Sequence, residues 1–437
     1  MPKVKLELHW QILIALALAV VAGFLTGTDG GLFGISAYSV YGFLGALFLN
    51  ALKMLIVPLI ASTIITGVAG LGKSGSLGRL GGRTLLFYAI TTLAAIFAGL
   101  LMVDLITPGI INGEPARHLL GLDAAGANVA ASVGRADSGD LVGIFLQMVP
   151  PNIIAAAAEG QMLGLIFFSL LFGYFMTRVE SPVASTVQSF WEGVAAVMMK
   201  MTEWVMKFAP IGVFGLVAKV IAETGFSAFK PLLTFAVAVI AAYAIHALVT
   251  MPLLIRFVAK ASPLKMYRAM GPALLTAFST ASSSATLPVT MESVEKDAGV
   301  SNRISSFVLP LGATVNMNGT ALYECVAAIF IAQAYGLDLS FATQFTIVIT
   351  ALLTSVGVAG IPSASMVAIA IILKTVGLPF EAVGVLFAID RPLDMMRTSL
   401  NVFGDSVCAL IVARYEGEEG LLGIRQPAVP VAEAGLD

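Results

Sequence analysis

A stripe of polar side chains near the end of the chain could bind ions or a charged small molecule. In the sequence DRPLDMMRTSLNVFGD the stripe consists of Asp390, Asp394, Arg397, Thr398, Asn401 and Asp405. On an α-helix, at about 100° per residue, these side chains fall within an arc of roughly 100°. An ionised Asp or Arg in the middle of a membrane helix costs about 2.5 to 3.5 kcal/mol. The stripe therefore predicts a functional pathway, and the plainer alternative is a structural ion pair between Asp394 and Arg397.

A second polar cluster lies in the preceding apolar stretch, PLGATVNMNGTALYE at 310–324. It contains Asn316, Asn318, Thr320 and Glu324 among one proline and two glycines. Proline and glycine loosen a helix and free carbonyl oxygens, which suit hard cations such as sodium. The segment therefore predicts a cation site, the alternative being a kinked helix whose amides bond to each other.

Both clusters belong to a chain that is too apolar for a soluble globular fold. Of its 437 residues, 58% are hydrophobic and 11% are charged, and the mean hydropathy is +0.95. Soluble domains carry about 25% charged residues. The formal net charge of -2 and the lack of a basic stripe argue against a nucleic-acid partner. Cys325 and Cys408 both lie in apolar segments, which favours neither a disulfide framework nor a thiolate metal site.

Long apolar stretches predict an all-α protein with eight transmembrane helices. We expect these spans near 9–27, 40–69, 84–107, 141–178, 184–222, 228–257, 302–335 and 380–413. Lysine and arginine are concentrated in the turns at 70–83 and 256–268, which places these turns and both termini on the cytoplasmic side.

Two further apolar segments, 265–295 and 341–376, are interrupted by small polar residues and proline. The interruptions read STASSSATLP and SVGVAGIPSAS. A continuous helix would leave backbone groups unsatisfied there, so we expect two re-entrant helical hairpins that meet at mid-membrane. A hairpin from each side, each followed by one full span, predicts inverted repeats around a central binding site.

These motifs carry a resemblance to a known family. SSSATLPVTM, NMNGTALYE, AGIPSAS and DxxRTxxNxxGD occur in order, and over nearly the whole chain the sequence resembles the glutamate transporter family of dicarboxylate/amino acid:cation symporters. The resemblance implies a multi-pass protein of the cell (inner) membrane that is not an enzyme. It implies a homotrimer that imports glutamate or aspartate with Na+ and/or H+ by an elevator mechanism, in contact with membrane lipid and without a further cofactor. The alternative within the family is a C4-dicarboxylate:cation symporter.

The resemblance also assigns roles to individual residues. Arg397 would bind the side-chain carboxylate of the substrate and Asp394 its amino group. Other residues that would line the substrate are Ser283, Thr320, Ile361, Thr398 and Asn401. The sodium sites would use Tyr88, Thr91, Thr92, Gly312, Thr314, Asn316, Asn318, Ser355, Val356, Val358, Asn401 and Asp405. Glu324 would carry a proton.

Three departures from the family pattern bear on coupling. Asn318 stands where the family has a carboxylate, which should weaken or remove the third sodium site. The archaeal arginine of the first hairpin is Ala281, and the extra arginine of the vertebrate last helix is Met395. These last two departures argue against potassium counter-transport.

The resemblance further divides the chain into a rigid scaffold and a mobile transport unit. The scaffold would comprise 1–83 and 108–222, the transport unit 84–107 and 228–414, and the tail 415–437 would be a disordered cytoplasmic end.

Rival functions have weaker support. A channel needs a continuous polar pore, whereas the polar residues here cluster near the midplane. GVAGLGKS at 67–74 matches a phosphate-binding pattern but lacks the strand that must precede it. Ser74, in the same turn, has no evident base for an intramembrane protease.

Overall fold

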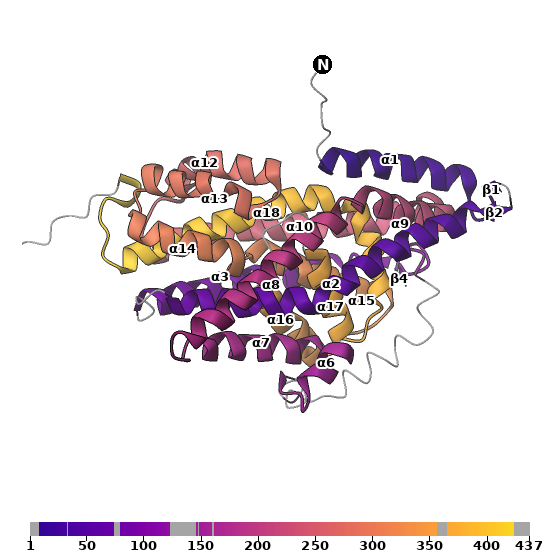
Figure 1. Ribbon diagram of the computed structural model, residues 1–437. Coiled ribbons are helices and arrows are strands. Elements are labelled where there is room, and N and C mark those ends of the chain that lie inside the picture. Colours follow the sequence, from indigo (N-terminus) through magenta and orange to yellow (C-terminus); the bar gives the residue numbers. More distant parts are fainter. Residues whose placement is uncertain are drawn as a thin grey trace, which may run out of the picture.

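The structure is a computed structural model that describes residues 8–32, 34–73, 79–122, 146, 148–159, 161–355 and 365–423. This part of the chain is mostly helical (Figure 1). Its strands form two short antiparallel hairpins. In the first, β1 (Gly31–Leu32) pairs with β2 (Ile35–Ser36); in the second, β3 (Ile110–Ile111) pairs with β4 (Glu114–Pro115).

A first group of helices packs around α2. The group consists of α1 (Leu8–Thr26), α2 (Ala37–Lys73), α7 (Met162–Met176), α8 (Val183–Met206) and α9 (Ala209–Thr224). Helices α7, α8 and α9 all pack on α2, and α1 packs on α9. The short α6 (Ile153–Glu159) precedes and contacts α7. We refer to these elements as the first helix group.

The second helix group surrounds the C-terminal helix α18. Its α-helices are α3 (Arg79–Ile106), α10 (Phe229–Ile245), α11 (Met251–Leu253), α12 (Pro263–Thr280), α13 (Ser283–Glu292), α14 (Asn302–Val315), α15 (Asn318–Ala334), α16 (Phe341–Ser355), α17 (Ser365–Thr375) and α18 (Val383–Tyr415). The π-helical turns η3 (His246–Thr250), η4 (Leu254–Val258) and η5 (Ser293–Asp297) continue α10, α11 and α13. The short 3-10 helices are η2 (Gly225–Ala228), η6 (Phe380–Ala382) and η7 (Leu421–Gly423). In Figure 1, α12, α13 and α14 lie at one end of the molecule, and α18 runs from there toward α9.

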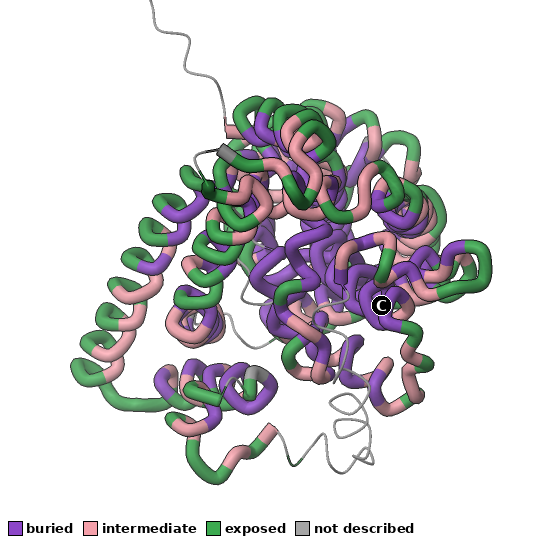
Figure 2. Tube along the Cα trace, turned by 90° about the vertical axis from the view of Figure 1, so that its right-hand side faces the viewer, coloured by how far each residue is buried: buried purple, intermediate pink, exposed green. Residues whose placement is uncertain are grey.

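Four helical stretches of the described chain are long and apolar enough to cross a membrane: Ala37–Ala69, Arg79–Ile106, Ala209–Val258 and Asn302–Ala334. The last stretch spans α14 and α15. All residues of its most apolar 18-residue segment are buried, compared with 39% to 50% of the residues in the corresponding segments of the other three stretches. This stretch is therefore the centre of the molecule, and Figure 2 shows the buried segments gathered inside a shell of exposed turns. The predicted eight spans and two re-entrant hairpins remain predictions.

Several expected spans are broken into shorter helices. The span expected at 184–222 consists of α8 and α9, because helix α8 ends at Met206 and Pro210 occupies the first turn of α9. Within 141–178, the described residues form α6 and α7 rather than one helix. The span at 302–335 breaks at Asn316 and Met317, whose backbones are not helical.

Each of the two interrupted segments contains two helices, α12 and α13 in the first and α16 and α17 in the second. Helix α12 ends at Thr280 and is followed by Ala281, which has left-handed backbone angles (φ +48°). Ser282 caps the start of α13 by accepting a hydrogen bond from Ala285 N. The two helices pack on each other. Helices α16 and α17 also pack together, and the residues that join them, 356–364, lie outside the described chain.

The first residues of the tail expected to be disordered from residue 415 are packed against the protein, and residues 424–437 lie outside the described chain. Residues Glu416–Gly423, which we name the C-terminal clasp, fold back onto the second helix group. The Glu416 carboxylate lies 2.7 Å from Arg83 Nη1, 3.6 Å from Arg79 Nε and 3.7 Å from Arg303 Nη2. Leu422 N donates to Ala298 O at 2.9 Å. Ion pairs and backbone hydrogen bonds hold this segment, so the lack of a periodic apolar pattern did not indicate that it is ordered.

A buried polar site on the last helix

The polar stripe predicted on the last helix is buried. Helix α18 is continuous over the whole stripe despite Pro392. Asp390, Asp394, Arg397, Thr398, Asn401 and Asp405 are each between 2% and 4% exposed. The side chains point into the second helix group, where α3, α10, α12, α14 and α15 all pack on α18. The stripe is therefore shielded from lipid by its own group of helices.

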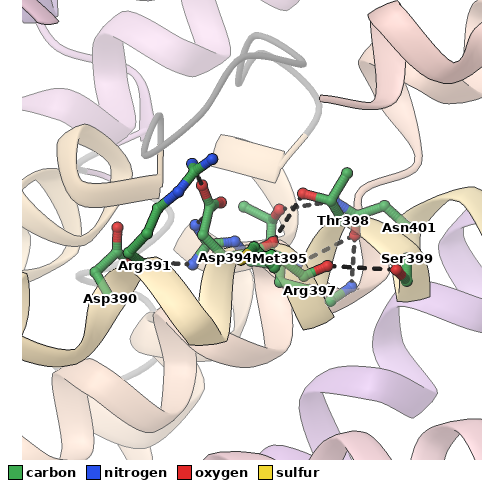
Figure 3. A network of polar contacts seen from close by, with 10 residues as sticks. Asp390, Arg391, Asp394, Met395, Arg397, Thr398, Ser399 and Asn401 are labelled. Atoms are coloured by element: carbon green, nitrogen blue, oxygen red, sulfur yellow. Dashed lines mark hydrogen bonds and ion pairs between the residues drawn. The ribbon is translucent and has the colours of Figure 1, made fainter. Parts of the chain in front are cut away.

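The charged residues of the stripe form one chain of ion pairs (Figure 3). Arg397 Nη2 donates to Asp394 Oδ1, and Arg397 Nη1 lies 3.5 Å from Asp390 Oδ1. A second arginine, Arg391, donates from Nη1 to Asp394 Oδ2 at 3.1 Å. In Figure 3 the Arg391 guanidinium stands over the Asp394 carboxylate. Two positive and two negative charges balance, which reduces the cost of burying them.

Sequence reasoning missed Arg391 as a member of this site. On a helical wheel its side chain lies about 20° beyond that of Thr398, at the edge of the polar arc. The same wheel that grouped the other residues could have included it. Arg391 is 6% exposed, so its charge is as much a part of the buried network as that of Arg397.

Aromatic and acidic groups of α15 complete the surroundings of Arg397. Its Cζ atom lies 4.6 Å from the centre of the Tyr323 ring, a cation–π contact. Next along the helix, Glu324 is fully buried and its Oε2 accepts a hydrogen bond from Thr354 Oγ1 at 2.7 Å. Within the described residues, the Tyr323 hydroxyl and Glu324 Oε1 have no hydrogen-bond partner. The predicted proton carrier is therefore buried beside α16 with one oxygen to spare.

The break between α14 and α15 brings the predicted cation ligands together. Asn316 Nδ2 donates to Asp405 Oδ1 at 2.9 Å. The hydroxyls of Thr91 and Thr92 both lie 3.3 Å from Asn316 Oδ1, and Thr92 also donates to Asn318 Oδ1 at 3.0 Å. Carboxylate, amide and hydroxyl oxygens thus converge from α3, α14, α15 and α18, which is the donor set that hard cations prefer.

Glycine permits this convergence. A Cβ atom at Gly312 would lie 2.5 Å from Asp405 Oδ1 and 3.0 Å from the Tyr88 hydroxyl. A Cβ atom at Gly404 would lie 2.5 Å from Asn318 Nδ2. A larger residue at either position would displace these ligand side chains or the helices that carry them. Gly312, expected to offer its backbone, therefore also sets the distance between α14 and α18.

Asn401 links α18 to the start of α15. Its Oδ1 accepts hydrogen bonds from Gly319 N at 2.8 Å and Thr320 N at 3.3 Å, and its Nδ2 donates to Thr320 Oγ1 at 3.0 Å. These are backbone donors that the first turn of a helix leaves unsatisfied. Thr398 donates to Asp394 O at 2.8 Å.

Tyr88 borders this convergence, because its hydroxyl would lie 3.0 Å from a Cβ atom at Gly312, whereas the other remaining predicted ligands lie apart from it or outside the described chain. Thr314 is exposed, and its hydroxyl donates to Leu311 O of its own helix. Ser355 is buried at the end of α16 and donates to Leu352 O at 2.8 Å. Tyr88 donates to Val308 O of α14 at 2.5 Å, and Ser283 is the buried first residue of α13. Val356, Val358 and Ile361 lie outside the described residues.

Helices able to cross a membrane, with a buried and charge-balanced site among them, are typical of a membrane transporter, and comparisons identify the family. Residues 8–415 match the sodium:dicarboxylate symporter family, and the chain belongs to this family. It is 35% identical to the proton/glutamate-aspartate symporter of Escherichia coli, over 95% of this chain and 94% of that protein. It is 34% identical to the proton/sodium-glutamate symport protein of Geobacillus stearothermophilus, covering 95% and 96% of the two chains.

Animal relatives show that overall identity does not decide the substrate. The chain is 33% identical to mouse excitatory amino acid transporter 3, over 94% of this chain and 86% of that protein. It is 36% identical to the bovine neutral amino acid transporter B(0), over 94% and 82%. The residues of the site must therefore distinguish an acidic from a neutral substrate.

Proposed function

We propose that this protein imports aspartate or glutamate across the cell membrane by symport with Na+ or H+. The observation that carries the proposal is the buried pair of Arg397 and Asp394. A planar guanidinium makes paired hydrogen bonds to a carboxylate, and a carboxylate binds an ammonium group. A substrate that carries both groups can replace Asp394 with its carboxylate on Arg397, and replace Arg397 with its ammonium group on Asp394.

Arg397 favours an acidic over a neutral substrate. Its side chain is 2% exposed. Among the described residues, its ion-pair partners are the carboxylates of Asp394 and Asp390. Removing a buried partner from a charge is costly, so Arg397 is expected to reject an apolar side chain at this position. The proposal therefore agrees with the relatives named for glutamate and not with the neutral amino acid transporter.

The cation ligands supply the coupling. Carrying a singly negative substrate into a negative-inside cell opposes about 2.3 kcal/mol per 100 mV. At least two cations per substrate make the step electrically downhill. Asp405 with Asn316, Thr91 and Thr92 is proposed to hold sodium. Glu324, buried with one free oxygen among the described residues, is proposed to carry a proton. No other cofactor enters the proposal.

The two helix groups are proposed to act as scaffold and transport unit in a trimeric elevator. Leu216 of α9 is the contact that suggests sliding. A Cβ atom at Gly45 of α2 would lie 2.7 Å from Leu216 Cδ2, and one at Gly384 of α18 would lie 3.2 Å from the same atom. A cavity of about 480 Å³ lies beside this contact, between α2, α9 and the start of α18. A contact that involves small residues next to a cavity supports movement of one helix group relative to the other. We also propose that both termini are cytoplasmic.

Transport into proteoliposomes tests the function. Radiolabelled glutamate and aspartate uptake would be measured with a sodium gradient, a pH gradient, or both, imposed separately. We expect saturable uptake that requires at least one gradient. Uptake that does not saturate, or that is independent of both gradients, would contradict symport.

A further inference from the structure

The two oxygens of the Asp394 carboxylate have different partners. Oδ2 accepts from Arg391 at 3.1 Å, and Oδ1 accepts from Arg397. Arg391 and Arg397 are 6% and 2% exposed, so neither arginine can exchange its partner for bulk water without moving. Asp394 is therefore compensated twice, by two cations that approach separate oxygens.

The proposed substrate needs only one of these oxygens. Under the proposed function, Arg397 leaves Asp394 to bind the substrate's side-chain carboxylate, and the substrate's ammonium group replaces it. We propose that Arg391 is a positioning residue that stays on Oδ2, so that Oδ1 alone is exchanged between Arg397 and the ammonium group. This inference rests on the proposed function and adds a specificity determinant to it.

A permanent partner changes which ligands the site can accept. When Arg397 binds a dicarboxylate that has no ammonium group, Asp394 keeps one described cation, Arg391. Without Arg391, the same ligand would leave a buried carboxylate with neither arginine nor ammonium, which is strongly unfavourable. Arg391 therefore lowers the selectivity of the site for the ammonium group, and the unaltered protein binds C4- or C5-dicarboxylates measurably.

The structure gives Arg391 the means to remain in place. Its Nη1 donates to Asp394. Because Arg391 lies three residues before Asp394 on α18, the helix holds the two side chains next to each other. Its Nε is buried and has no partner among the described residues. A second donor of the same guanidinium is thus still available near the site.

The test compares two pairs of ligands that differ in the ammonium group: glutamate with glutarate, and aspartate with succinate. Their dissociation constants would be measured by titration calorimetry on the purified full-length protein in sodium buffer. Arg391→Gln removes the charge, Arg391→Lys keeps it, and Arg178→Gln removes an exposed arginine on the surface as a control.

We expect Arg391→Gln to increase the preference for the amino acid over its matched dicarboxylate by at least about tenfold, while Arg391→Lys and Arg178→Gln keep the original preference. An equal loss for both ligands would mean that Arg391 only supports the fold, and it would overturn the inference. So would failure of the unaltered protein to bind either dicarboxylate while it binds glutamate.

Two outcomes separate this inference from the proposed function. If the unaltered protein binds no acidic amino acid in sodium, the proposed function fails first. If Arg391→Gln does not fold, Arg391→Lys decides: a folded lysine variant must keep the original preference, and a changed preference would overturn the inference.

Discussion

Asn316 and Asp405 are 89 residues apart in the chain, yet Asn316 Nδ2 donates to Asp405 Oδ1 at 2.9 Å in the core of the protein. The contact joins the broken end of α14 to the middle of α18. It also places the carboxylate of α18 beside the hydroxyls of α3, because Thr91 and Thr92 lie against the same amide. A single amide thus connects the three helices whose oxygens are proposed to hold the cation.

Asn318→Asp should strengthen sodium binding. Asn318 Oδ1 already accepts a hydrogen bond from Thr92, whereas its Nδ2 is buried and has no partner among the described residues. Replacing that nitrogen with a carboxylate oxygen adds charge where a cation can compensate it. We expect sodium to reach half-saturation of glutamate binding at a concentration several-fold lower. A sodium titration checks this, with Ser399→Asp, whose hydroxyl bonds to backbone on the α12 side of α18, as a control for added charge. An unchanged sodium requirement would remove Asn318 from the cation site.

Arg397→Thr should abolish binding and uptake of aspartate and glutamate, and it should admit neutral amino acids. The reason is the loss of the guanidinium that pairs with Asp394 and Asp390. Losing a charge-paired contact of this kind costs about 3 to 5 kcal/mol, which is at least a hundredfold in affinity. Uptake of labelled glutamate and, separately, of labelled serine or alanine into proteoliposomes measures the change, and Arg178→Thr serves as the surface control. Acidic uptake at the original rate would refute the role of Arg397.

Gly312→Ala should destabilise the protein and disrupt coupling. The added methyl group would lie 2.5 Å from Asp405 Oδ1, and overpacking of this kind costs about 1 to 3 kcal/mol. Gly271→Ala is the matched control, because a Cβ atom there meets no atom within 4 Å; in a helix that change is neutral or slightly stabilising. Thermal unfolding in detergent and sodium-dependent uptake check both variants. Equal behaviour of the two would show that α14 and α18 can separate without cost.

A pair of cysteines can report movement between the helix groups. In the variant Leu216→Cys with Gly384→Cys, one thiol lies on α9 and the other on α18, at the contact described above. The native Cys325 and Cys408 are both buried and should not interfere. We expect the yield of cross-linking to change when glutamate and sodium are added together. Gly45→Cys with Leu216→Cys joins two helices of the first group, so its yield should stay constant. An invariant yield for both pairs would count against the elevator.

The C-terminal clasp should contribute to stability through Glu416. Its side chain is 8% exposed and faces three arginines, from α3 and α14. Hydrogen bonds to charged groups contribute about 1.5 to 3 kcal/mol, so Glu416→Gln should lower the midpoint of thermal unfolding. Glu419→Gln changes an exposed residue of the same segment and should have little effect. If both variants melt together with the unaltered protein, the clasp does not stabilise the second helix group.

The polar stripe was predictable because helical periodicity acts within one segment. The spacing of Asp390, Asp394 and Arg397 already requires one face of a helix, and burial follows from the cost of charge in lipid. The break at Asn316 was likewise indicated by the proline and glycines around it. These features depend on neighbours in the chain, which the sequence displays directly.

Features that depend on distant residues could not be predicted in the same way. Glu416 is ordered because Arg79, Arg83 and Arg303 surround it, and nothing near Glu416 in sequence indicates those partners. The break between α8 and α9 is a different case, because Lys207 and Pro210 lie beside it and give a local stop signal that the span expected at 184–222 overlooked. A helical wheel could have placed Arg391 at the edge of the polar stripe. Its ion pair with Asp394 could not be predicted, because it depends on the direction in which the Arg391 side chain points.

The position of the clasp limits how the protein can be modified for experiments. Leu421 and Leu422 are 4% and 5% exposed, and Lys265 Nζ donates to Leu422 O at 3.2 Å, so the chain is still packed seven residues after α18 ends. A purification tag or fluorescent protein attached beyond Gly423 leaves these contacts intact. A truncation that stops at Tyr415 would instead remove this buried leucine pair and leave three basic side chains without their shared acid.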